Sequence, residues 1–247
     1  MNSAPRFDPF PPSSQPDVLS QAARSALRKA APDEEAGTAP ISASIDILRD
    51  AGLMLEDGAA SPLRTAHALM QIGAANLSVG RLWEGHVNAL RLIRLYGSPA
   101  QAEHAKQVIK DGGLLGVWGA NGGTPTTAEY GVLQGEKIFA SGLGTVTHAL
   151  ITLNSGAQVQ LALIDVTAPK RGDATQWDML GMRATASGTY DFSGLPLGED
   201  ALIGAPGDYL KEPHFIGGVW RIAALQAGAA AGLIDAVGSD AFTMPDV

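Results

Sequence analysis

The sequence predicts an α+β protein in which a block of helices precedes a β-rich region and one further helix. Three observations favour this class. Helical spacing of apolar residues and Ser-Pro start signals occur before residue 113, and glycines, β-branched residues and turn signals dominate from 114 to about 207. An apolar stretch rich in Ala and Gly then follows Pro213. Helices and strands segregated in this way are typical of α+β proteins rather than of alternating βαβ units.

Residues 1–113 carry the helical signals. We expect a flexible arm with a short helix over 1–40, the helix lying at 17–30, and a helical domain over 41–113 that starts with a short helix at 41–51. Ser61-Pro62 and Ser98-Pro99 each combine an N-cap residue with proline at the first helical position. They predict helices from 61 to about 73 and from 100 to 110, and apolar spacing predicts another over 82–96.

Residues 114–212 are predicted to form a β-domain, and residues 213–247 to begin with one helix over about 217–237. Gln134-Gly135 is interpreted as the turn of a hairpin, and Asn154-Ser155-Gly156 as the turn of a second hairpin. In the last helix, Ala223, Ala227, Gly228 and Ala231 would let another helix approach closely. Strands are expected at 114–118, 129–133, 136–140, 148–153, 158–166 and 189–192.

Composition excludes several classes of function. The chain has 247 residues, a net charge of −8 and no cysteine. Acidic proteins lack the basic face that nucleic acids and anionic membranes require, so neither partner is expected. The apolar stretch 216–237 is interrupted by Arg221, Gln226 and Asp235, which favours a buried helix over a membrane span. The absence of cysteine fits a cytoplasmic protein and excludes disulfides and thiolate metal sites.

Common catalytic motifs match poorly. Gly142-Leu143-Gly144 has Thr147 where a dinucleotide fingerprint has its third glycine, and residues 131–137 lack the spacing of a phosphate-binding loop. The five histidines show no paired spacing that suggests zinc, so no metal is expected. A triad of Ser141, His148 and Asp165 stays a hydrolase hypothesis, although no nucleophile elbow supports it.

The segment Gly-Glu-Lys-Ile-Phe-Ala-Ser-Gly at 135–142 is more informative. It places Ser141 at the end of a predicted strand beside Gly142. Backbone N–H groups and one hydroxyl at such a position can meet the polar edge of a planar ligand, as in mostly apolar pockets with few polar groups. A plain strand that ends in a turn is the alternative interpretation.

This segment resembles a motif of the acyl-CoA dehydrogenase family, Gly-x-Lys-x-aromatic-x-Thr/Ser. Gly135, Lys137, Phe139 and Ser141 match it. The resemblance implies that Phe139 packs near a flavin and that Ser141 hydrogen-bonds the edge of its isoalloxazine ring. Ala140, between them, is then also a cofactor-binding residue.

Two further segments carry the resemblance, which covers about 41–237. Residues 117–125 stand where the family has its flavin-and-substrate loop, with Thr124 on the family's serine and Trp118 replacing its threonine. Residues 180–187 are similar to the family's Gly-x-Arg-x-Ser-x-Thr run, with Arg183 on the arginine. The resemblance implies that Trp118 contacts the flavin and that Thr124 and Arg183 contact the substrate.

The family's architecture implies a helical domain, an antiparallel β-barrel-like middle domain and the start of a C-terminal helical bundle. It implies FAD as cofactor, an acyl thioester or another small molecule as substrate, and a homo-oligomer, because a neighbouring subunit supplies FAD contacts. In the family a carboxylate base removes an α-proton while hydride leaves for the flavin, which carries the redox chemistry.

The sequence departs from the family at the catalytic base. The usual base is expected beyond Val247, and Trp220 occupies the alternative base position. The chain is therefore expected to be a C-terminally incomplete member that binds FAD weakly. The open hypotheses are a flavin oxidoreductase, either a dehydrogenase or a monooxygenase that needs no such base, an inactive binding or assembly remnant, and the hydrolase using Ser141.

Overall fold

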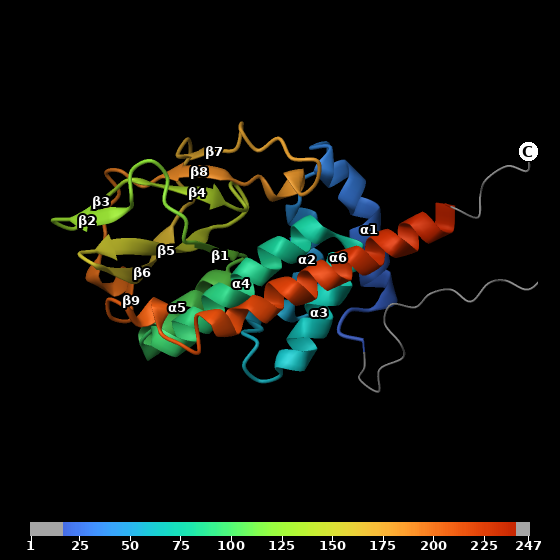
Figure 1. Cartoon of the computed structure of the whole chain (residues 1–247), viewed down its shortest axis with the longest axis horizontal. Coiled ribbons are helices and arrows are strands. Elements are labelled where there is room, and N and C mark those ends of the chain that lie inside the picture. The colour runs from blue at the N-terminus through green and yellow to red at the C-terminus, as the bar shows by residue number, and fades with distance from the viewer. Residues whose placement is uncertain (1–16, 241–247) are drawn as a thin grey trace, which may run out of the picture.

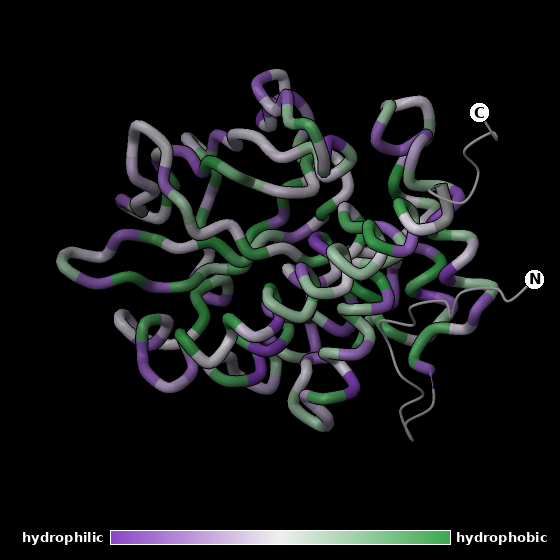
Figure 2. The backbone as a smooth tube through the Cα atoms, turned by 45° about the vertical axis from the view of Figure 1, so that its right-hand side comes forward, coloured by the Kyte–Doolittle hydropathy of each residue, from purple (hydrophilic) through white to green (hydrophobic). Residues whose placement is uncertain are grey.

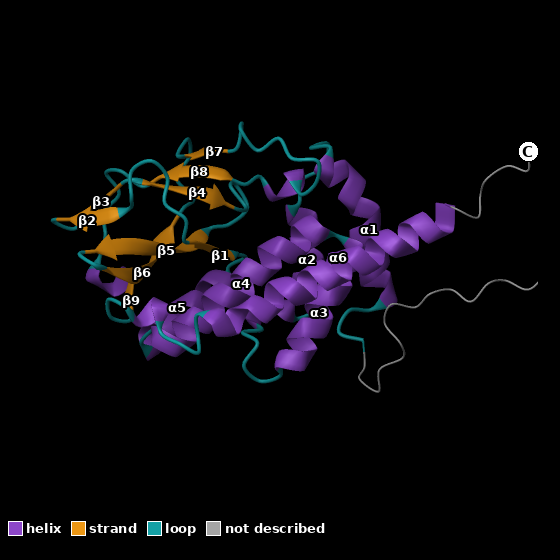
Figure 3. Ribbon diagram, viewed as in Figure 1, coloured by secondary structure: helices purple, strands orange, loops and turns teal. Residues whose placement is uncertain are grey.

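The structure is a computed structural model that describes residues 17–240, with the side chains of the last two left out. Helices gather on one side of the molecule and strands on the other (Figures 1 and 3). The arm expected at residues 1–16 and the tail at 241–247 lie outside the described residues. The predicted order of helices, strands and one further helix is found.

The helical block has the start signals that the sequence predicts. Ser61 Oγ accepts a hydrogen bond from the Arg64 N–H, and Ser98 forms a reciprocal capping box with Gln101. The first helix starts later than expected, after the N-cap Ser20, and it continues through Pro32. The helices are α1 (Gln21–Glu35), α2 (Ser42–Asp50), α3 (Pro62–Ala75), α4 (Leu77–Tyr96) and α5 (Pro99–Lys110), with a 3₁₀ turn η1 (Leu53–Leu55) after α2.

The strands of the described residues form three sheets rather than one closed barrel, so the barrel-like form of the middle domain is not confirmed. The largest sheet has the order β1-β5-β6-β9, with β1 parallel to β5 and the other pairs antiparallel. Its strands are β1 (Leu115–Trp118), β5 (His148–Ser155), β6 (Gln158–Asp165) and β9 (Leu202–Ile203). The β5–β6 hairpin confirms the predicted hairpin, but its turn lies at 156–157, because Asn154 and Ser155 still pair with Val159 and Gln158.

The other predicted hairpin is wrong. β2 (Thr127–Glu129) pairs with β3 (Val132–Gln134), whereas β4 (Glu136–Ala140) joins a different sheet of order β4-β8-β7. The backbone of Gly135 has φ +94°, and a Cβ there would lie 2.7 Å from Thr124 O. The turn therefore redirects the chain between two sheets instead of folding it back on itself. The partner strands are β7 (Gly172–Asp173) and β8 (Gly188–Asp191).

Helices and strands share one hydrophobic core, which includes Trp83, Leu115, Trp118 and Leu150. Hydrophobic stretches of the backbone run through the middle of the molecule, where the two layers meet (Figure 2). Three 3₁₀ turns connect later elements, and a fourth precedes the last helix: η2 (Arg183–Thr185), η3 (Glu199–Ala201), η4 (Asp208–Leu210) and η5 (Ile216–Gly218). The β-domain is thus fixed against the helical block.

The last helix, α6 (Val219–Asp240), crosses the helical block and packs along α3 and α4 (Figure 1). Gly228 and Gly232 lie so close to α3 that an added Cβ would overlap the carbonyl oxygens of Met70 and Ala74. Of the small residues expected to admit a neighbouring helix, Gly228 and Ala231 are buried, whereas Ala223 and Ala227 are exposed. No helix in the described range is long and apolar enough to cross a membrane.

His86 links three elements of the fold. Its Nε2 lies 2.7 Å from Met54 O, and its Nδ1 accepts a hydrogen bond from the Leu115 N–H at 3.0 Å. A carbonyl oxygen can only accept, so Nε2 carries the proton and the ring is neutral. The side chain is fully buried, and it ties α4 to η1 and to the first strand. The expectation that this histidine is a satisfied polar residue is confirmed.

The burial of His86 predicts a loss of stability in mild acid. Burial lowers the pKa of His86 from 6.5 to about 4, so near pH 6 and below the unfolded chain binds a proton that the folded chain does not. The contribution of neutral, buried His86 to the free energy of unfolding is complete above pH 6.5, and it declines as the pH falls toward 4. We expect the free energy of unfolding to fall by about 2 kcal/mol between pH 7 and pH 5, measured by urea denaturation. A His86→Gln variant with the same pH dependence would assign the loss to another group.

Candidate flavin-edge site

The end of β4 presents an aromatic ring to solvent. The register with β8 shifts between Lys137 and Ala140, and Phe139 has φ +53°. A positive φ is uncommon for a bulky residue, and such strain often occurs at functional positions. The side chain of Phe139 is 63% exposed. The bulge therefore turns the ring of Phe139 outward beside Ser141, while Ala140 is buried.

Ser141 is half-buried and holds an orienting hydrogen bond. Ser187 Oγ donates to Ser141 Oγ at 2.9 Å, and Thr185 Oγ1 lies 2.9 Å from Ser187 Oγ. The Ser141 hydroxyl has only a long contact of 3.5 Å to Phe139 O for its own proton. Since Ser141 Oγ accepts from Ser187 and donates only to Phe139 O at this long distance, a ligand that offers a closer acceptor can replace that contact.

Trp118 lies beneath this edge rather than on it. Its side chain is 2% exposed, and its indole Nε1–H donates to Ser141 O at 3.0 Å. The ring contacts Tyr190 and Phe192 at centroid distances of 5.4 and 6.4 Å. The indole is thus placed to support the Ser141 backbone, and its predicted direct contact with the cofactor stays a prediction.

Residues 119–125, within the segment 117–125 that was compared with the family's flavin-and-substrate loop, run antiparallel along β4. The Gly122 N–H donates to Glu136 O, the Glu136 N–H donates to Thr124 O, and the Ile138 N–H donates to Ala120 O. Glu136 Oε1 also accepts from the Gly123 N–H at 2.9 Å. We call residues 119–126 the anchored loop. Thr124, the predicted substrate residue, is exposed on it.

Lys137 lies beneath the anchored loop and is fully buried. Its Nζ donates to Asn121 Oδ1 at 2.6 Å and to Thr152 Oγ1 at 2.7 Å, and lies 3.5 Å from Gly119 O. Burial lowers the pKa of Lys137 from 10.5 to about 8. The sequence identified Lys137 as a motif residue, but nothing in the pattern shows that it would be buried without a carboxylate.

A buried ion pair joins α4 to α6. Arg221 Nε lies 3.3 Å from Glu84 Oε1, and Arg221 Nη2 donates to Asn88 Oδ1 at 2.6 Å. Glu84 also accepts from Arg81 at 2.9 Å. Arg221 is 2% exposed, and within the described residues its Nη1 has no hydrogen-bond partner. Trp220, at the alternative base position, is half-buried and offers no carboxylate.

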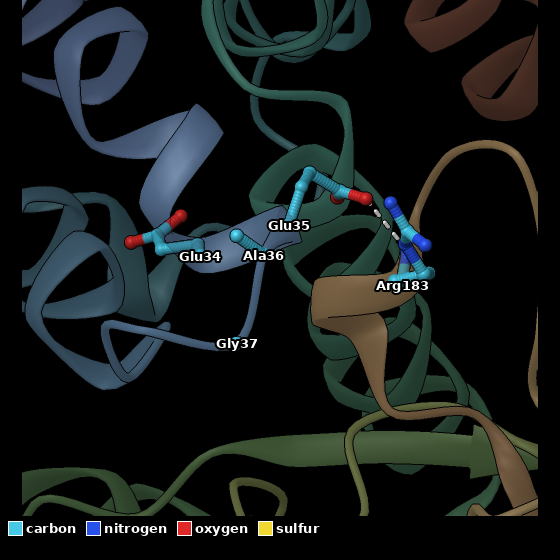
Figure 4. Close-up of a pocket in the computed structure, with 5 residues that line it drawn as sticks. All are labelled: Glu34, Glu35, Ala36, Gly37 and Arg183. Carbon is cyan, nitrogen blue, oxygen red and sulfur yellow. Dashed lines mark hydrogen bonds between the residues drawn. The ribbon is translucent and has the colours of Figure 1, made fainter.

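Arg183 lies at a separate cavity of about 330 Å³ between the end of α1 and η2 (Figure 4). Its backbone N–H donates to Glu35 Oε2 at 2.7 Å, and the Glu35 carboxylate points toward it while that of Glu34 points away. Glu34 is buried and accepts hydrogen bonds from Ser44 and Asn76. The predicted substrate role of Arg183 stays a prediction, since the cavity belongs to the α1 side of the molecule.

Ser141, His148 and Asp165, the residues of the hypothetical triad, each form hydrogen bonds with residues outside the triad. Ser141 pairs with Ser187, His148 Nδ1 lies 3.2 Å from Thr147 Oγ1, and Asp165 Oδ1 accepts from Thr167. His148 and Asp165 are opposite each other on β5 and β6. This geometry lacks the serine–histidine hydrogen bond that a triad requires.

Comparisons with known proteins find similarity to monooxygenases. No protein-family profile matches the chain. A dibenzothiophene monooxygenase of Rhodococcus erythropolis is 29% identical over 160 residues, 57% of this chain and 38% of that protein. A dibenzothiophene monooxygenase of Mycolicibacterium goodii is 27% identical over 161 residues, with the same shares covered. The chain therefore spans less than half the length of these curated relatives.

Solved structures extend the likeness to the whole described fold. Dibenzothiophene monooxygenase TdsC of Paenibacillus sp. A11-2 has a TM-score of 0.74 and 23% identity, covering 92% of this chain and 65% of that chain. TdsC has also been solved with FMN bound. Methanesulfinate monooxygenase MsuC of Pseudomonas fluorescens has a TM-score of 0.72 and 18% identity, covering 93% and 65%. The chain thus shares an acyl-CoA dehydrogenase-like fold with these two monooxygenases.

Proposed function

We propose that this chain is the flavin-binding part of a flavin-dependent monooxygenase that acts on a small, largely apolar molecule. The observation that carries the proposal is the edge formed by exposed Phe139 and by Ser141, whose hydroxyl donates only a long hydrogen bond that a ligand can replace. The two curated relatives are both monooxygenases, which favours oxygen transfer over the dehydrogenation of an acyl thioester.

The residues at the β4 edge fit a flavin. The exposed ring of Phe139 offers a face for an isoalloxazine system, and offset aromatic contacts of this kind are favourable. Ser141 can donate to a polar atom at the rim of that ring, and the buried Trp118 indole holds the Ser141 backbone in place. The FMN-bound structure of TdsC supports FMN as a cofactor to test beside FAD.

A reduced flavin, when bound, activates dioxygen and transfers one oxygen atom to the substrate while the other leaves as water. The residues of this chain would hold the ring and orient its edge. Oxygen transfer to sulfur or to an electron-rich ring does not require removal of an α-proton by a carboxylate base. The absence of a carboxylate at Trp220 is therefore compatible with this reaction class, whereas it removes one of the two expected bases for acyl-thioester dehydrogenation.

The substrate class follows from the relatives by analogy. Dibenzothiophene is a planar sulfur heterocycle, and TdsC has been solved with FMN and indole together. We therefore expect a planar heteroaromatic compound or a small organosulfur compound to be the substrate. An acyl thioester is the alternative that must be tested beside it.

The test is a parallel assay of the two reaction classes. The protein is supplied with a flavin reductase, NADH, FMN or FAD, ¹⁸O₂ and dibenzothiophene or indole, and products are examined by mass spectrometry. Incorporation of ¹⁸O into product supports the proposal. Anaerobic bleaching of bound flavin by acyl-CoA without oxygen incorporation would instead establish dehydrogenation.

Removal of the Ser141 hydroxyl tests the flavin edge directly. Ser141→Ala is expected to weaken flavin binding by about 1 kcal/mol, the net contribution of one hydrogen bond. Fluorescence titration of FMN and FAD measures this change, with Ser155→Ala, at the exposed end of β5, as the matched control. Equal flavin affinity in the Ser141 variant and the wild type would exclude Ser141 from the site.

A further inference from the structure

Among the described residues, Lys137 differs from the buried cation Arg221, because none of its hydrogen-bond partners there is a carboxylate. Arg221 has Glu84 as its partner, whereas Lys137 Nζ contacts only the neutral oxygens of Asn121, Thr152 and Gly119. Transfer of an ammonium group into the interior costs free energy that neutral acceptors only partly offset. Lys137 is therefore a poor contributor to global stability, and its buried charge calls for a local explanation.

The contacts of Lys137 supply that explanation. Asn121 and Gly119 belong to the anchored loop, and Thr152 belongs to β5. Thr152 Oγ1 itself donates to Gly119 O at 2.8 Å, so the carbonyl oxygen of Gly119 is contacted by both Lys137 and Thr152. Charge-assisted hydrogen bonds are shorter and stronger than neutral ones. The Lys137 ammonium therefore holds the first half of the anchored loop against β4 and β5. We call the contacts of Lys137 with Gly119, Asn121 and Thr152 the clamp.

The clamp lies next to the flavin edge in sequence and in space. Lys137 precedes Phe139 by two residues on β4, and the Ile138 N–H donates to Ala120 O in the same loop. Movement of the loop would thus release the backbone on one side of the bulge that turns Phe139 outward. On the other side, β4 is held by β8.

We propose that Lys137 is a positioning residue, which fixes the anchored loop and the Phe139 bulge in the geometry that binds flavin. This inference rests on the proposed flavin site. Lys137 acts through the loop and the strand and does not touch the cofactor.

The clamp should weaken in alkali. Since burial lowers the pKa of Lys137 to about 8, the ammonium loses its charge at a pH where exposed lysines keep theirs. A neutral amine donates weaker hydrogen bonds to Asn121 and Thr152. The other titratable groups on the elements packed around Lys137 are Glu136 on its own strand, Tyr190 and Asp191 on β8, His148 on β5, and Tyr209 beside Gly119.

The experiment compares wild type with Lys137→Met, Lys137→Arg and the exposed control Lys110→Met at pH 7 and pH 9. Three quantities are measured: the free energy of unfolding, hydrogen–deuterium exchange of the amides at 119–126, and the dissociation constants of FMN and FAD. Asn121→Ala removes the loop-side acceptor of Lys137 and serves as a second route if Lys137→Met fails to fold.

We expect Lys137→Met to be at least as stable as wild type, yet to exchange its loop amides faster and to bind flavin about tenfold more weakly, the scale of one charge-assisted hydrogen bond. Wild-type affinity should fall between pH 7 and pH 9, the affinity of Lys137→Met should not, and Lys137→Arg should retain affinity at pH 9. A residue needed only for packing would lower stability without this pH signature.

Two results would overturn the inference. Unchanged exchange of the loop in Lys137→Met and Asn121→Ala would show that Lys137 does not hold the loop. Faster exchange with unchanged flavin affinity would show that the loop does not position the site. A wild-type chain that binds neither FMN nor FAD would instead overturn the proposed function, and exchange alone would then decide whether Lys137 clamps the loop.

Discussion

Replacement of Glu84 by glutamine is expected to lower the free energy of unfolding by about 3–5 kcal/mol, the cost of removing one partner from a buried ion pair. Glu84 and Arg221 are 5% and 2% exposed, and their side chains join α4 to α6. Without the carboxylate, the Arg221 guanidinium would keep Asn88 as a partner and would remain a buried charge near Arg81. Chemical denaturation with urea measures the change.

Two comparisons separate the buried pair from general effects of charge. Glu103→Gln breaks exposed pairs with Lys106 and Lys110 and is expected to change stability by less than about 1 kcal/mol. The double variant Glu84→Leu/Arg221→Met removes both charges and is expected to recover most of the loss, because no unpaired charge then remains. A loss below about 1 kcal/mol in Glu84→Gln would show that the pair does not hold α6 in place.

Gly228→Ala is expected to destabilise the protein by about 3 kcal/mol, the upper end of the cost of overpacking. The added methyl group would overlap Met70 O and the Met70 backbone, which cannot move aside as a flexible side chain can. The helices α3 and α6 would have to separate along much of their contact. Thermal and urea unfolding of the purified variant measure the effect.

The same helix supplies a matched control. Gly238 has no atom within 4 Å of an added Cβ, so Gly238→Ala is expected to be neutral or to stabilise the helix by up to about 1 kcal/mol through helix propensity. If Gly228→Ala proved as stable as Gly238→Ala, this result would contradict the close approach of Gly228 in α6 to the backbone of α3.

The sequence predicted most of the helices because their signals are local. A serine N-cap followed by proline fixes a helix start through contacts within four residues, as at Ser61 and Ser98. The hairpin of β5 and β6 was predictable for the same reason, although its turn lies at 156–157 rather than at 154–156. The assignment of Gln134-Gly135 failed because β4 takes its partner from β8, some fifty residues later, and no local pattern encodes that pairing.

The site could be predicted only in part. The motif at 135–142 identified Phe139 and Ser141, and the structure brings both to the surface end of β4. The buried positions of Trp118 and Lys137 depend on packing against Tyr190, Phe192 and Thr152, which come from strands distant in sequence. Glu84 and Arg221 are 137 residues apart, so no local sequence pattern predicts that they form an ion pair.

The most direct measurement is a fluorescence titration of FMN and of FAD with wild-type protein and with Phe139→Ala. We expect saturable binding of at least one flavin, weakened about tenfold in the variant, since stacking of a planar ring on an aromatic side chain contributes about 1–3 kcal/mol. Failure of the wild type to bind either flavin, or equal affinity in the two proteins, would contradict a flavin site at the end of β4.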